Sequence, residues 1–187
     1  MLTRGRSSGC FDNVGGIKRV YLFRYERYPI FQLSGLQDGE LTDFPPVNYF
    51  AYDIQGGSFT EGIVNDENGV KFEQTLTFTL TKQDRDTTAE LDRIQKSDVR
   101  FVVVFNNGDM KMGGCVNGAK LIDYNIDSGS SKASLNGYKL TFTAVEEYSA
   151  PIIRKMNPID PDAGFLLLED GNFVLQENYY YIKLENN

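Results

Sequence analysis

The residues best suited to acid–base chemistry are two adjacent glutamates, Glu146 and Glu147. Most glycoside hydrolases use a pair of carboxylates, one as the acid and the other as the base or nucleophile. The residues before this pair alternate like a β-strand, and successive residues of a strand point to opposite faces. We therefore expect both carboxylates to be solvated charges at a strand end rather than a shared site.

Other catalytic and metal-binding systems lack their essential residues. The 187-residue chain has no histidine, which excludes Ser-His-Asp and Cys-His nucleophile systems and most zinc and copper sites. It also has no Cys-X-X-Cys pair, no GxxxxGK[ST] phosphate loop and no GxGxxG fingerprint. We therefore expect no enzymatic activity, no metal and no cofactor.

Two weaker signals have ordinary structural interpretations. Cys115 follows a glycine pair but has no base beside it, so it is expected to be a small core residue. Asp160 and Asp162 resemble part of a calcium loop, but Pro161 and the missing distal ligands favour a turn.

Composition and charge restrict the class of protein. The formal net charge is −7, whereas a protein that grips nucleic-acid phosphates needs a net basic face. Aromatic residues make up 13%, with 13 Phe, 11 Tyr and no Trp, which favours β-strands. No apolar run reaches the ~18 residues that span a membrane, and residues 1–16 lack the apolar core of a secretion signal. We expect a protein that stays in the cytoplasm or enters a particle assembled there.

The clearest element is a strand over residues 70–82, where polar and apolar residues alternate. This period of two indicates a half-buried antiparallel strand. The apolar side comprises Phe72, Gln74, Leu76, Phe78 and Leu80. The other side is expected to face water or another subunit, and comprises Glu73, Thr75, Thr77, Thr79 and Thr81.

The remaining pattern predicts a mainly β fold with one short α-helix. The helix is expected over 88–96, because Thr87 and Glu90 have capping-box spacing. An apolar run, FVVVF, predicts a strand covered on both faces, followed by a turn at Asn107-Gly108. The predicted strands are 17–25, 30–33, 49–54, 58–64, 70–82, 100–105, 110–112, 119–126 and 138–145.

The chain divides into a Gly-rich arm (1–16), a β body (17–151) and an extension (152–187). Prolines 151, 158 and 161 mark a linker, and Asp170-Gly171 predicts the turn of a C-terminal β-hairpin. A lone hairpin is marginally stable in water, so this one either folds back on the body or docks onto a neighbouring subunit. The apolar residues expected to make that contact are Phe165, Leu166, Leu167, Leu168, Phe173 and Leu175.

Several segments resemble structural proteins of bacteriophage tails. The stretch FEQTLTFTLTKQDRDTTAELDRIQKSDVRFVVVFNNGDMKMGGCVNGAKL carries the resemblance most clearly. The segment SGSSKASLNGYKLTFTAVEEYSAPI looks like the part that closes the body of such proteins. The start, CFDNVGGIKRVYLFRY, is similar to the openings of tail proteins in phages of Bacteroidota, including the crAss-like group.

This resemblance covers residues 10–151 and implies the tail-tube fold. That fold is a β-sandwich or rolled sheet flanked by a helix, whose inner sheets join those of other subunits into a barrel around a channel. It implies a virion protein, assembled in the host cytoplasm into a ring of six copies or a multiple of six, in contact with neighbouring tail or connector proteins. A face lined by threonines and acids over residues 73–81 would let genomic DNA pass without specific binding. Tube, hub, adaptor and completion proteins all remain open, and no membrane partner is expected.

A second hypothesis is a β-sandwich module that binds a carbohydrate or a receptor on a virion or cell surface. Tyr179, Tyr180 and Tyr181 could stack on sugar rings. The absence of tryptophan counts against this hypothesis, and binding to a glycan array would favour it.

Overall fold

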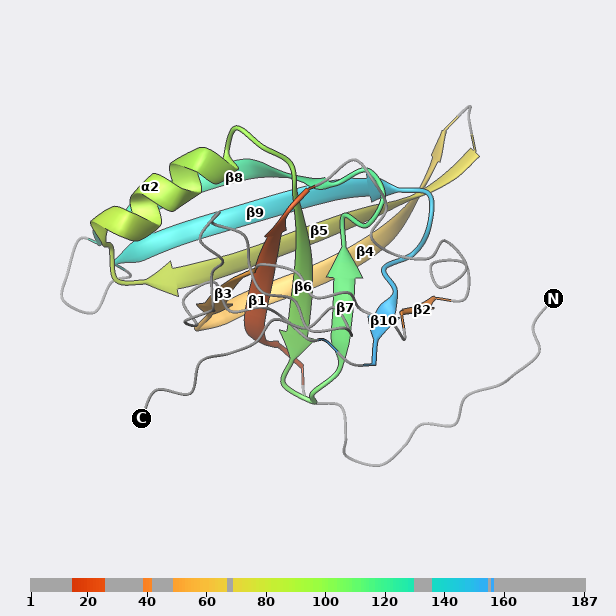
Figure 1. The fold of residues 1–187 in the computed structure, drawn as a ribbon, viewed down its shortest axis with the longest axis horizontal. Helices are drawn as coiled ribbons and strands as arrows, with labels where there is room; N and C mark the ends of the chain where they lie inside the picture. The colour runs from red at the N-terminus through yellow and green to blue at the C-terminus, as the bar shows by residue number, and fades with distance from the viewer. Residues whose placement is uncertain are drawn as a thin grey trace, which may run out of the picture.

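The computed structural model describes residues 15–25, 39–41, 49–66, 69–129, 136–154 and 156. Over these residues the chain is mainly β-sheet with one helix, which confirms the predicted fold class (Figure 1). In chain order the elements are β1 (Ile17–Arg24), β2 (Glu40–Leu41), β3 (Phe50–Asp53), β4 (Gly56–Asp66), β5 (Gly69–Thr81), α2 (Arg85–Ile94), β6 (Val99–Phe105), β7 (Met110–Gly113), β8 (Ala119–Asp127), β9 (Gly137–Glu146) and β10 (Ile152–Ile153).

The strands form two layers that share one hydrogen-bonded connection. β6 and β8 are joined by a single residue pair, Val99 with Ala119, so the sheet bends sharply there. We call β3, β1, β6, β7, β10 and β2 sheet I, and β8, β9, β5 and β4 sheet II. The strands of the two sheets cross steeply in Figure 1, as in an orthogonal sandwich.

The main core lies between the two sheets. The ring of Phe59 on sheet II meets that of Phe101 on sheet I, with ring centres 6.0 Å apart. Within sheet II, Phe78 stacks on Phe142 at the same separation of 6.0 Å. The helix α2 adds Leu91 and Ile94 to this core. Burial of these apolar side chains is the main force that holds the two sheets together.

The FVVVF strand is covered on both faces, as predicted. Phe101 and Val103 belong to the core between the sheets. Val102 points the other way, into a second buried cluster that also contains Met112 and Ile153. Sheet I therefore has buried side chains on both of its faces.

The predicted start of the helix is wrong. The helix begins at Arg85 and its N-cap is Asp84, not Thr87. The Asp84 carboxylate accepts a hydrogen bond from the backbone N–H of Thr87 at 2.8 Å, and this bond lowers the pKa of Asp84. Aspartate is among the best N-cap residues because its oxygen satisfies a free amide of the first turn.

Two very short strands fall where loop or linker was predicted. β10 (Ile152–Ile153) pairs with β7 on one side and in parallel with β2 on the other. The β body therefore extends to Ile153 rather than ending at residue 151. Several predictions concern residues outside the described ranges. They are those for the 1–16 arm (except Gly15 and Gly16), the 30–33 strand, Asp160 and Asp162, the C-terminal hairpin with its apolar residues, and Tyr179 to Tyr181.

Candidate assembly surface

The threonines predicted to share one face of β5 are joined by hydroxyl residues of both neighbouring strands. Antiparallel partners that lie directly opposite each other point to the same face of a sheet. Thr75 lies opposite Thr60 of β4 and Thr143 of β9. We call the resulting surface the threonine face, which comprises Ser58, Thr60, Thr75, Thr77, Thr79, Thr141 and Thr143.

The alternation on β5 is confirmed. Gln74, Leu76, Phe78 and Leu80 are buried on the inner side, and Thr75, Thr77 and Thr79 are half-buried on the outer side. At the ends of the row, Glu73 and Thr81 are exposed. The hydroxyl oxygens of Thr77 and Thr141 lie 3.3 Å apart, so the centre of the face is a ladder of hydroxyl groups.

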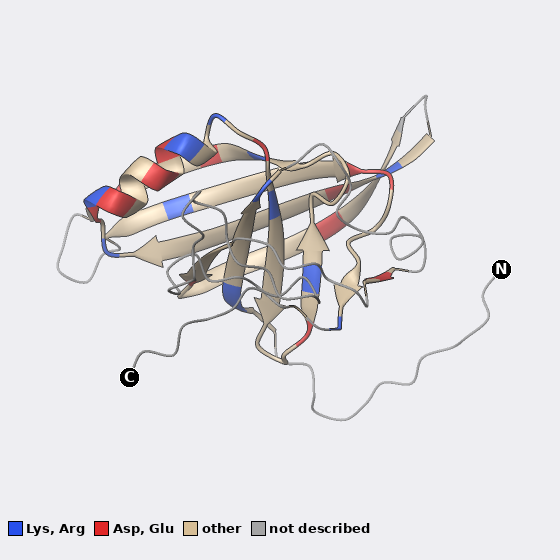
Figure 2. Ribbon diagram, in the orientation of Figure 1, with Lys and Arg blue, Asp and Glu red and all other residues tan. Residues whose placement is uncertain are grey.

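The described charges on β5, β8 and β9 beside the threonine face are of both signs. Figure 2 shows that the long strands of sheet II are mostly uncharged. By register, the same side of β5, β8 and β9 carries Lys71, Lys120, Lys139, Glu73, Asp123 and Asp127. On these three strands the described side chains are three cations and three carboxylates, so the charge there is mixed in sign.

No described element packs on the threonine face. The first buried cluster fills the space between the sheets, and the second lies on the far side of sheet I. Neither cluster contains a residue of the threonine face. In the described part of the chain, this broad polar surface is therefore left to solvent or to another molecule.

Among the described residues, sheet II ends in two strands whose outer edges are largely unpaired. Among the described strands, β4 pairs only with β5. On its outer side β8 is bonded to β6 only at Ala119. β4 contains no Lys, Arg or Pro, the residues that commonly block pairing at a sheet edge. Such an edge is a template for a strand of another chain.

Large apolar side chains are exposed on these two edge strands. Ile63 of β4 is 64% exposed, and Ile122 and Ile126 of β8 are 63% and 45% exposed. Ile122 lies at a β-bulge, where the register of β8 against β9 shifts between Leu121 and Asp123. Exposed apolar groups beside free strand edges are typical of subunit contacts.

The structure separates the two adjacent glutamates, as the strand pattern predicted, but Glu146 is not solvated. Glu146 is 1% exposed, while Glu147 is exposed. The carboxylate of Glu146 accepts hydrogen bonds from the backbone N–H groups of Val116 and Asn117, both at 3.0 Å. The expectation of a solvated charge was wrong for Glu146 because a distant loop folds over the strand end.

The environment of Glu146 is structural in character. Burial raises its pKa, and the bound amides and the nearby Arg100 act against that rise. Arg100 is also buried, at 1% exposure. Its Nε donates to the carbonyl oxygen of Cys115 at 3.0 Å, and its guanidinium lies 4.7 Å from the ring centre of Tyr25. The Glu146 carboxylate thus holds a loop in place.

We expect Glu146→Ala to lower the free energy of unfolding by about 3 kcal/mol, because it leaves two amides unsatisfied and a buried arginine less compensated. The neighbouring change Glu147→Ala should alter stability by less than about 0.5 kcal/mol, since that side chain is exposed. Urea unfolding of the two variants measures both values. Equal losses would contradict the structural role of Glu146.

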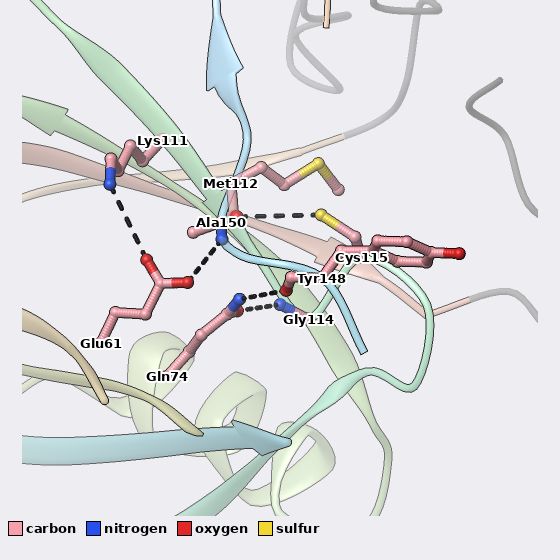
Figure 3. Close-up of polar contacts among 8 residues, drawn as sticks. All are labelled: Glu61, Gln74, Lys111, Met112, Gly114, Cys115, Tyr148 and Ala150. Carbon is pink, nitrogen blue, oxygen red and sulfur yellow. Dashed lines mark hydrogen bonds and ion pairs between the residues drawn. The ribbon is translucent and has the colours of Figure 1, made fainter. Parts of the chain in front are cut away.

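A group of polar residues that the sequence did not single out joins the two sheets (Figure 3). Gln74 is fully buried; its Oε1 accepts from the N–H of Gly114 at 3.1 Å, and its Nε2 donates to the carbonyl of Tyr148 at 3.5 Å. Glu61 of β4 accepts from the N–H of Ala150 at 2.8 Å and lies 3.8 Å from Lys111 of β7. The signal that could have found this junction is the single amide within the apolar row of β5.

Cys115 lies in the same region and is buried, as predicted. Its Sγ lies 3.7 Å from the carbonyl oxygen of Met112, and burial raises the pKa of the thiol. A raised thiol pKa disfavours the thiolate, which is the reactive form.

A groove of about 730 Å³ lies between α2 and the strands β1 and β3. Its lining includes the apolar residues Leu22, Phe50 and Ile94 and charged residues of α2 such as Asp86 and Arg93. It lies away from the threonine face and from Glu146. In the described ranges, no three Asp, Glu or Cys residues are grouped to hold a metal ion, and no described helix has the length and apolar character to cross a membrane.

The two free edges and the threonine face are thus the features of the described residues that point to another molecule. No protein-family model matches the sequence, and neither a curated protein nor a solved structure matches it.

Proposed function

We propose that this chain is a structural subunit of a phage tail that assembles with copies of itself into a ring. In this assembly the threonine face lines the channel through which DNA passes. The observation that carries the proposal is a four-stranded antiparallel sheet with two edges, and a face rich in hydroxyl groups, that the described part of the chain leaves uncovered. The resemblance to tail proteins supports the same conclusion.

The strand order of sheet II favours closure into a barrel. Its four strands alternate in direction from β8 through β9 and β5 to β4, so β8 and β4 run opposite to each other. Rotation about a ring axis keeps the direction of every strand. β4 of one copy therefore meets β8 of the next as an antiparallel neighbour, and a closed ring leaves no unpaired edge in this sheet.

The same geometry decides which face points inward. The inner side of sheet II is filled by sheet I of the same chain, through contacts such as Phe59 with Phe101. Sheet I must then lie on the outside of the barrel, and the threonine face must line the channel. Each copy contributes its own row of hydroxyl groups to the lining.

The chemistry of the lining suits DNA that must move. Hydroxyl groups bind water and carry no charge, and the described charges beside them on β5, β8 and β9 are of both signs. Strong attachment to DNA requires a net basic surface that displaces counterions from the phosphates. A surface without that excess lets the duplex pass without being held.

Labelling of single cysteines tests this orientation. Lys139→Cys places a thiol beside the threonine face, and the control Asp92→Cys places one on α2; both positions are exposed in the single chain. Each variant also carries Cys10→Ser, is assembled, is reacted with biotin-maleimide and is then incubated with streptavidin. We expect streptavidin to bind at position 92 in the assembly, but at position 139 only after dissociation. Equal binding at both positions in the assembly would refute a channel lined by this face.

A further inference from the structure

Sheet II is staggered, and its two edge strands overhang at opposite ends. Ala119, the first residue of β8, lies in the same cross-strand row as Ala144, Gln74 and Glu61. β4 continues past that row from Gly62 to Asp66. At the other end of the sheet, Asp127 of β8 lies in the same cross-strand row as Thr81. The first residue of β4 lies opposite Thr79, so β8 extends beyond the start of β4. A neighbour that covers the overhang of β4 must therefore be displaced along the strands.

We propose that β4 of one copy pairs with β8 of a second copy at a displacement of four residues. The displacement is counted from the alignment that would place Glu61 opposite Ala119 of the second copy. Phe59 then lies opposite Ile126 of the second copy, and Ile63 lies opposite its Leu121. The inference rests on the proposed ring and specifies its subunit contact. The displacement must be even, because a shift of one residue would turn the threonine face of the next copy to the other side.

Matching of apolar side chains selects four among the even displacements. At four, the exposed Ile63 meets Leu121 and the bulged Ile122, and the partly buried Phe59 meets the exposed Ile126. Tyr124 then lies opposite Glu61, whose carboxylate can accept a hydrogen bond from a phenol. Apolar cross-strand pairs of this kind stabilise a sheet.

The other displacements leave apolar groups poorly matched. At zero, Ile63 has no partner and Ile126 lies beyond the start of β4. At a displacement of two residues, Leu121 of the second copy faces Glu61, and its Ile126 faces Gly57. At a displacement of six residues, Ile126 faces Glu61 and Leu121 faces Asn65.

The geometry of barrels selects the same value. A displacement of four residues per copy is about 14 Å along the strands, and four strands occupy about 19 Å around the barrel. These lengths give a strand tilt of about 35°, inside the usual range of roughly 35–45°. Displacements of two and six residues give about 20° and about 47°, both outside that range. The result does not depend on the number of copies in the ring.

Disulfide cross-linking measures the displacement directly. Thr60 lies on the threonine face of β4, and Asn125 of the second copy is its partner at a displacement of four. At two the partner is Asp123, and at zero it is Lys120; all four side chains are exposed in the single chain. Each pair is built as two cysteine substitutions in one chain that also carries Cys10→Ser. Partners across a strand pair are close enough for a disulfide.

A disulfide within one chain cannot form in these variants, because two intervening strands keep β4 and β8 at least about 14 Å apart. After mild oxidation we expect Thr60→Cys with Asn125→Cys to give a ladder of covalent multimers on a non-reducing gel. The pairs with Asp123→Cys and Lys120→Cys should give at least tenfold less. Thr60→Cys alone should give no covalent dimer, whereas a two-fold contact between two β4 strands centred on position 60 would give one.

Each other outcome overturns the register. A stronger ladder from a control pair, dimers from Thr60→Cys alone, or rings that no pair cross-links would each show that the displacement of four is wrong. If a control pair gives the stronger ladder, or if no pair cross-links, rings in electron micrographs of the same samples would still support the proposed function. If no variant and no unmodified chain assembles, the proposed function fails as well.

Discussion

A chain with Ile63→Lys should fold normally and fail to assemble. Ile63 is 64% exposed in the single chain, so a lysine there costs the monomer little. In the proposed contact the same position lies against Leu121 of the next copy, where an ammonium group loses its water and gains no partner. Inward-pointing lysines are a common natural device against pairing at a sheet edge.

The matched control is Val70→Lys, which changes a 56% exposed apolar residue on the same hairpin but on the inner strand β5. We expect the change at position 63 to cost at least about 1.4 kcal/mol per contact, or about tenfold in its equilibrium constant. Sedimentation measures assembly, and thermal unfolding confirms that both variants are folded. Rings that form equally well with Ile63→Lys would contradict the role of this edge.

The second large effect is expected from Thr77→Lys. Thr77 lies at the centre of the threonine face, between Ser58 of β4 and Thr141 of β9. Because its side chain is half-buried on an uncovered face, a lysine can extend into the channel without disturbing the core. Every copy then adds one positive charge at the same height, and the lining acquires the basic character that holds phosphates.

Assembled Thr77→Lys should therefore retain double-stranded DNA at low salt and release it at high salt, whereas the unmodified assembly should not retain DNA. Thr77→Glu is the control, because it removes the same hydroxyl contact and adds the opposite charge. Co-sedimentation with DNA over a salt series measures the difference. If both variants retain DNA equally, the face does not line the channel.

Much of the fold could be predicted because it is encoded by local alternation. The ten-residue pattern on β5 gave both the strand and the side on which Gln74 and Leu76 are buried. The apolar run of β6 correctly indicated a strand covered on both faces. These features depend on period-two patterns that a strand carries in its own sequence.

The features that could not be predicted depend on distant partners. β10 and β2 have two residues each, too few to show a pattern. β10 is a strand because β2 and β7 lie on either side of it, and β2 is a strand because it pairs with β10. Glu146 is buried because residues 116 and 117 fold over it. The N-cap was misplaced because two acceptors compete near the helix start, and the carboxylate of Asp84 reaches the free amide of Thr87.

The candidate surface was predicted only in part. The sequence placed Glu73, Thr75, Thr77, Thr79 and Thr81 on one side of a strand, and their role in a channel stays a prediction. The pairing of Thr77 with Ser58 and Thr141 follows from register, which a single sequence does not reveal for strands so far apart. The free edges of β4 and β8 likewise appear only once the strand order is known.

Negative-stain electron microscopy of the purified chain, over a range of protein and salt concentrations, tests whether copies join into a ring. We expect closed rings or short tubes with a stain-filled centre, built from copies joined edge to edge through sheet II. Particles of single-chain size under every condition, with β4 and β8 unpaired, would contradict this expectation.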